Sequence, residues 1–146
     1  MIRNEGEYKM ALQRLAEDDQ FATAQMQAFL ATELTADEVD RAMQPTRTFH
    51  AQLREEIEWY ERVKRRDFGA LQNLAGFGRL LIALRIANEI SQRELAMRLG
   101  VSEAQVSRDE RNEYHGITME RAQRILDALD ERLSSSVEQK PLQTVA

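Results

Sequence analysis

The residues between 91 and 111 carry the clearest chemical pattern in the chain, SQRELAMRLGVSEAQVSRDER. Ser91 is followed three residues later by Glu94, and Ser102 is followed three residues later by Gln105. A serine hydroxyl at this spacing accepts a hydrogen bond from the first helical turn, while the Glu or Gln side chain bonds back to the serine N–H. The pattern predicts two helices that begin directly after the two serines.

A tight turn is expected between these two helices. Gly100 lies where the first helix must end, and glycine adopts a left-handed backbone conformation without a steric cost. Two short helices joined by a glycine-containing turn form a helix-turn-helix, which places its second helix in the major groove of DNA. The apolar residues expected on the inward face are Leu95, Leu99, Val101 and Val106.

The charge of the chain is distributed unevenly. The 146 residues carry a net charge of −5, which argues against a protein that coats nucleic acid without specificity. Residues 1–73 hold 10 Lys or Arg against 14 Asp or Glu, whereas residues 74–133 hold 9 Arg against 10 acidic residues. DNA binding by the second region must therefore depend on where its arginines point, and its affinity for DNA should be salt-dependent.

The sequence lacks the features of several other protein classes. There is no cysteine, and His50 and His115 lie far apart without a third ligand at a metal-binding spacing. No nucleophile and base are suitably placed, so we expect no enzymatic activity, no metal and no cofactor. The opening residues MIRNEG are not a signal peptide, and no apolar run would span a bilayer. These features predict a cytoplasmic protein without membrane association.

The fold class is predicted to be all-α. Good helix formers dominate, with two prolines, six glycines and no alternating strand-like runs. We expect a first helix at 5–17 and a short second helix that is capped by residues 18–20. Thr35 and Glu38 form a capping pair for a segment that Pro45 interrupts or kinks. The remaining helices are expected at residues 46–66, 77–87, 92–99, 103–111 and 119–132.

The predicted helix at 46–66 carries a sustained apolar stripe. This stripe packs either on the first two helices or against another subunit or a partner protein, and its spacing is not a strict heptad. We divide the chain into a helical dimerisation or partner-binding domain at 1–73, a helix-turn-helix domain at 74–133 and a flexible tail at 134–146. The stripe consists of Phe49, Leu53, Ile57, Tyr60 and Val63.

The second region resembles the Xre-type, lambda-repressor-like DNA-binding domain from about Ala75 to Leu133. An acidic helical region in front of it, with Tyr-Glu-Arg at 60–62, is similar to HigA-like antitoxins. The residues that carry the DNA-binding resemblance are LRIA at 84–87, SQRELA at 91–96, LGVS at 99–102, QVSR at 105–108 and Glu110.

The resemblance implies roles for particular residues. Gln92, the first residue of the first motif helix, would direct its side chain and backbone N–H at a DNA phosphate. Arg108 would make a bidentate contact to guanine, and Glu103 would accept from a cytosine amino group or discriminate against wrong sequences. The implied groove-facing residues are Ser102, Glu103, Ala104, Ser107 and Arg108, while Arg111 and the loop at 112–116 would lie beside the DNA backbone.

The resemblance also implies a partly buried ion pair between Arg85 and Glu110, which would tie the opening helix to the second motif helix. One residue departs from the family pattern, because Asp109 occupies a position that is usually apolar or aromatic. We expect either that the end of this helix turns outward early, or that Asp109 forms a hydrogen bond within the loop that follows.

The predicted function is a sequence-specific transcriptional regulator that binds double-stranded DNA. One helix-turn-helix recognises few base pairs, so we expect a homodimer on an inverted repeat. The dimer surface is either the N-terminal region or the final helix. The candidate residues in the final helix, which also fit the core of the domain, are Ala122, Ile125, Leu126 and Leu129.

Within this interpretation, the antitoxin resemblance implies a protein that binds a basic toxin through residues 1–73 and represses its own promoter. Two alternatives remain open. The first is a stand-alone or phage-type Xre repressor without a toxin partner. The second is a helical protein-interaction scaffold without DNA binding, which the nearly neutral charge of residues 74–133 favours.

Overall fold

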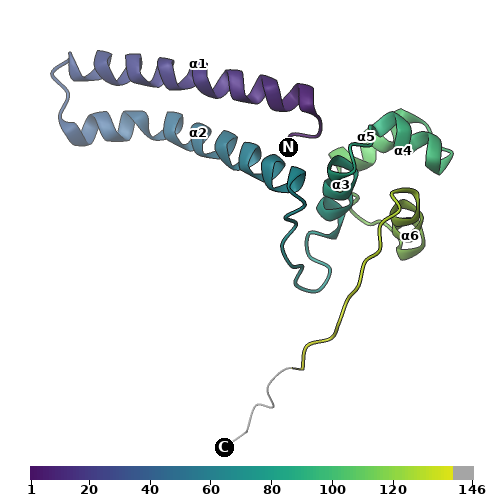
Figure 1. The fold of residues 1–146 in the computed structure, drawn as a ribbon. Helices are drawn as coiled ribbons and strands as arrows, with labels where there is room; N and C mark the ends of the chain where they lie inside the picture. The colour runs from purple at the N-terminus through teal and green to yellow at the C-terminus, as the bar shows by residue number, and fades with distance from the viewer. Residues whose placement is uncertain (140–146) are drawn as a thin grey trace, which may run out of the picture.

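The computed structural model describes residues 1–139, and within that range the chain forms six α-helices and no strand. Figure 1 shows a long hairpin of two helices, with the other four helices gathered near its open end. The all-α prediction is confirmed. The helices are α1 (Glu5–Leu30), α2 (Ala36–Lys64), α3 (Phe77–Ala87), α4 (Gln92–Leu99), α5 (Glu103–Arg111) and α6 (Met119–Ala128).

Helix α1 runs without a break through the position where we expected a new helix to start. Asn4 caps it by accepting a hydrogen bond from the backbone N–H of Glu7 at 2.8 Å. The predicted cap at residues 18–20 is wrong, because the acidic side chains there pair with basic side chains of α1 and α2 and do not cap a new helix. An oxygen of Asp19 lies 3.4 Å from His50 Nδ1 and 3.5 Å from a guanidinium nitrogen of Arg54, both on α2.

Helix α2 begins with the predicted capping box and continues past its proline. The Thr35 hydroxyl accepts from the N–H of Glu38 at 3.3 Å, and the Glu38 carboxylate accepts from the N–H of Thr35 at 2.8 Å. Pro45 lies inside the helix and does not end it. A proline inside a helix removes one backbone hydrogen bond and crowds the carbonyl four residues earlier, yet α2 continues past Pro45, with Met43 and Ile57 buried on either side of it.

The apolar stripe of α2 packs within the chain toward its C-terminal end. Ile57, Tyr60 and Val63 are buried in the same cluster as the core of α3, together with Ile2 from the N-terminal segment. Phe49, nearer the hairpin tip, stays exposed. The hairpin and the helices that follow it therefore share one continuous core.

Ion pairs close the junction between the hairpin and the remaining helices. Lys64 Nζ lies 3.0 Å from a Glu89 carboxylate oxygen, and Arg66 lies 2.6 Å from a Glu131 carboxylate oxygen. Helix α6 ends at Ala128, earlier than expected, and residues 131–139 continue without regular structure. The last seven residues of the predicted tail lie outside the described part of the chain.

Two tyrosines lie face to face between α1 and α2 near this junction. The rings of Tyr8 and Tyr60 stack with their centroids 4.9 Å apart, and their hydroxyls donate to the carboxylates of Glu61 and Glu5. Burial, assisted by the negative charge of Glu5, raises the pKa of Tyr60 to about 12. The folded state thus retains the Tyr60 proton over a range in which an unfolded chain releases it.

We expect the protein to lose stability as the pH rises from the ordinary tyrosine pKa of 10.0 toward about 12. In that window the unfolded chain has lost the Tyr60 proton and the folded chain has not, which favours unfolding. Tyr60→Phe should reduce this alkaline loss. Tyr8, whose pKa is also raised, should maintain part of it. Denaturant unfolding at several alkaline pH values measures the effect, and an identical loss in the wild type and Tyr60→Phe would contradict it.

Candidate nucleic-acid interface

The helix-turn-helix forms at the predicted residues. The hydroxyls of Ser91 and Ser102 accept from the N–H groups of Glu94 and Gln105, at 3.0 and 3.1 Å. Gly100 ends α4 with a left-handed φ of 69°. The side chain of Glu94 accepts from Arg98 at 2.7 Å rather than bonding back to its serine. The serine caps and the glycine turn therefore set the bounds of α4 and α5.

Helix α5 has one buried side and one exposed side. Val106 packs into the core with Leu95 and Ala96 of α4, and Glu110 is also buried. The opposite side of α5 is open to solvent. The exposed residues there are Glu103, Ala104, Arg108 and Arg111, with Ser102 exposed at the cap and Ser107 half-buried.

Arg85 and Glu110 form a buried ion pair between α3 and α5. Arg85 Nε contacts one carboxylate oxygen of Glu110, and Arg85 Nη2 lies 2.8 Å from the other. The two side chains are 3% and 0% exposed. Arg85 also donates to the backbone carbonyls of Ile90 at 2.8 Å and Arg3 at 3.3 Å. This two-contact geometry, with the remaining donors satisfied, is what a buried charge requires.

The side chain of Gln92 points to this ion pair. Gln92 Nε2 donates to a carboxylate oxygen of Glu110 at 2.7 Å, and the residue is half-buried. Its side chain thus has a protein partner, and the contact of Gln92 with a DNA phosphate stays a prediction. The first residues of α4 also present backbone N–H groups at a helix N-terminus, as that prediction requires.

Asp109 meets neither of the two expectations for it. Helix α5 continues past it to Arg111, and its carboxylate pairs with Arg121 of α6 and accepts from Gln105 Nε2 at 2.9 Å. An arginine of the next helix thus lies opposite Asp109 and balances its charge. Nothing in the local sequence pattern around Asp109 points to this arginine on α6.

The loop after α5 packs closely against the start of α3. Glu113 and Tyr114 both have positive φ angles, 51° and 52°. A Cβ atom at Gly78 would lie 1.8 Å from the Glu113 carbonyl oxygen, so the loop approaches α3 at a distance that only glycine permits. Arg79 lies over the Trp59 ring, with 5.4 Å from its guanidinium carbon to the ring centroid.

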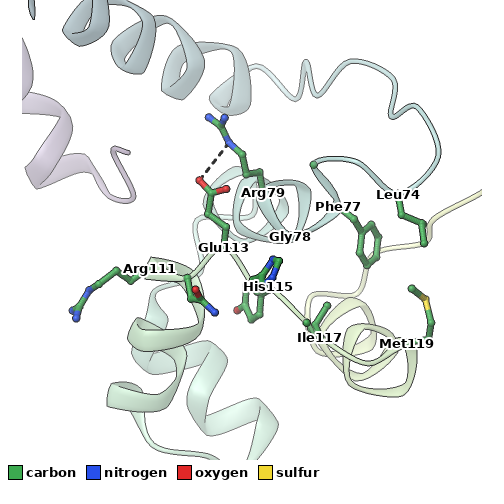
Figure 2. Close-up of a pocket in the computed structure, with 13 residues that line it drawn as sticks. Leu74, Phe77, Gly78, Arg79, Arg111, Glu113, His115, Ile117 and Met119 are labelled. Atoms are coloured by element: carbon green, nitrogen blue, oxygen red, sulfur yellow. Dashed lines mark ion pairs between the residues drawn. The ribbon is translucent and has the colours of Figure 1, made fainter.

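A shallow cavity of about 620 Å³ lies beside this contact. Figure 2 shows its lining, with Arg79 reaching toward Glu113, whose carboxylate is 4.0 Å away, and Arg111 pointing away from the other labelled side chains. His115 belongs to the same lining. The lining of the cavity thus includes two arginines near the C-terminal end of α5.

The described residues offer no other obvious chemistry. Within residues 1–139 no three His, Cys, Asp or Glu side chains are grouped so that they could hold a metal ion. None of the six helices is long and apolar enough to cross a membrane. The exposed side of α5 and its surroundings are therefore the candidate functional site.

Removing one member of the buried ion pair should destabilise the fold strongly. Glu110→Ala leaves the Arg85 guanidinium buried without its partner, which should cost about 3–5 kcal/mol. Lys64→Ala, which breaks an exposed ion pair, should cost at most about 1 kcal/mol. Urea unfolding measures both. If the two residues are coupled as described, the double variant Arg85→Met/Glu110→Leu should lose less stability than the sum of the losses in its two single variants. Losses that simply add would contradict the coupling.

Comparison with known proteins supports the helical geometry. A family model described as Helix-turn-helix matches residues 81–135, which include most of α3 and all of α4, α5 and α6. No curated protein matches the chain, and no solved structure does. The match confirms the lambda-repressor-like, Xre-type resemblance for this part of the chain, and it leaves the resemblance of the hairpin to HigA-like antitoxins unconfirmed. Residues 81–135 are thus similar to helix-turn-helix domains, a type of domain found in DNA-binding regulators.

Proposed function

We propose that the protein is a sequence-specific transcriptional regulator that inserts α5 into the major groove of DNA. The observation that carries this proposal is the two-sided character of α5. Its inner side is anchored by Val106 and by the buried Glu110, while its outer side is exposed among residues 1–139. A recognition helix needs both properties, because base contacts require a rigid position and open access.

Arg108 is the proposed base-reading residue. It is exposed, and its guanidinium donates to Gln105 Oε1 at 3.0 Å on the same helix. A guanine edge offers two acceptors in the geometry that arginine prefers, so the contact to Gln105 can be exchanged for one to DNA. Around Arg108 we propose that Ser102, Glu103, Ala104 and Ser107 face the groove and that Arg111 lies beside a phosphate.

Specific recognition also requires more base pairs than one such helix contacts, so we propose that two chains bind an inverted repeat. The pairing surface stays a proposal, and on α6 it would have to use residues other than the four apolar ones considered above. All four apolar residues proposed on the final helix are buried in the core of their own chain, and they are Ala122, Ile125, Leu126 and Leu129.

Arg108→Ala should weaken binding to the DNA upstream of the gene by about 1–3 kcal/mol, or roughly fivefold to 150-fold, with the loss concentrated at one base pair. Arg41→Ala is the matched control, because it removes the same charge from α2, on the hairpin. Fluorescence anisotropy at low and moderate salt measures both. An equal effect of the two variants would indicate binding by charge alone, and the absence of a wild-type complex at any salt would favour a scaffold.

Within this function we propose an antitoxin that binds a basic toxin through residues 1–73. Support comes from the acidity of the hairpin and its projection away from the helix-turn-helix (Figure 1). We expect a small basic protein encoded beside this gene to co-purify with the chain in a salt-sensitive complex. A solitary gene, or a neighbouring product that does not bind, would instead favour a stand-alone repressor.

A further inference from the structure

The hairpin carries large apolar side chains that no other segment among residues 1–139 covers. Met10 and Phe21 are 72% and 64% exposed. They are eleven residues apart in α1, close to three full turns, so both lie on one face about 16 Å apart. Phe49 of α2 is also exposed and borders this face, because the guanidinium carbon of Arg14 lies 4.7 Å from its ring centroid. We call Met10, Phe21 and Phe49 the apolar flank.

The apolar flank is not a part of the chain's core. The stripe of α1 that packs on α2 follows other positions, such as Tyr8, Ala11 and Leu15. In Figure 1 the tip of the hairpin, where α1 passes into α2, lies away from α3 to α6, whereas the N-terminal end of α1 lies near them. Arg14 and Glu17 lie between Met10 and Phe21 on this face and are also exposed, so the flank combines separate apolar anchors with charged side chains.

The charge of the hairpin determines which molecule fits. Residues 4–61 hold 13 Asp or Glu against 5 Lys or Arg, a balance of −8. If two copies of the chain met through this surface, two negatively charged hairpins would face each other, and like charges across an interface oppose association. A partner that covers the apolar flank should therefore be positively charged around an apolar strip.

We infer that the apolar flank docks an amphipathic helix of a partner protein, rich in Lys or Arg, whose apolar strip is about three turns long. Two anchors of that helix would contact Met10 and Phe21, and its basic sides would lie beside the acidic surface of the hairpin. The inference rests on the proposal that the hairpin is the partner-binding part of the protein. It does not depend on DNA recognition by α5.

The test uses the full chain and a labelled helical peptide of about 18 residues, five turns, with Leu along one face and Lys elsewhere. A peptide with Glu in place of Lys is the charge control. Met10→Ser/Phe21→Ser should weaken binding of the Lys peptide by about tenfold or more. The matched control is Val137→Ser, because Val137 is 97% exposed in the segment after α6. Fluorescence anisotropy measures each affinity, and circular dichroism checks the fold.

Three results would overturn the inference. The first is that the wild type binds the Glu peptide as tightly as the Lys peptide. The second is that Met10→Ser/Phe21→Ser binds the Lys peptide as tightly as the wild type does. The third is that the wild type self-associates in sedimentation experiments and that this variant does not. The last result would show that a second copy covers the flank. Binding to upstream DNA is measured in parallel. A chain that binds the peptide but no DNA would refute the regulator while leaving the flank in place.

Discussion

The arrangement of the whole helix-turn-helix depends on one buried guanidinium. Arg85 of α3 contacts both carboxylate oxygens of Glu110 on α5, the carbonyl of Ile90 before α4, and the carbonyl of Arg3 in front of α1. Gln92 of α4 completes the surroundings of Glu110. A buried carboxylate is costly unless a charged partner and hydrogen bonds surround it, so moving any of these segments would leave a buried charge without part of its surroundings. The direction in which α5 projects is a consequence of that requirement.

Local signals made the helix ends predictable. The caps at Thr35, Ser91 and Ser102 act through side-chain contacts three residues away, and the stop at Gly100 needs only a residue that tolerates a positive φ. Those features lie within one turn of the chain. The bounds of α4 and α5 therefore followed from the sequence alone.

Contacts between distant residues were not predictable in the same way. The expected break in α1 at residues 18–20 did not occur because Asp19 faces His50 and Arg54 of α2, more than 30 residues away in the sequence. Gln92 and Asp109 have partners 18 and 12 residues away, on other helices. Only the Arg85–Glu110 pair was anticipated among the long-range contacts, and its source was the family resemblance rather than any spacing in the chain.

The separation of charge along the molecule has a consequence for how it would approach a duplex. The hairpin residues 4–61 have a balance of −8, whereas residues 62–146 hold 14 Lys or Arg against 12 Asp or Glu. Such a molecule is an electric dipole whose negative end is the hairpin. The field of a polyanion such as DNA repels the negative end, so the positive end faces the duplex as the two molecules approach. This orientation raises the fraction of productive collisions at low ionic strength, where screening is weak.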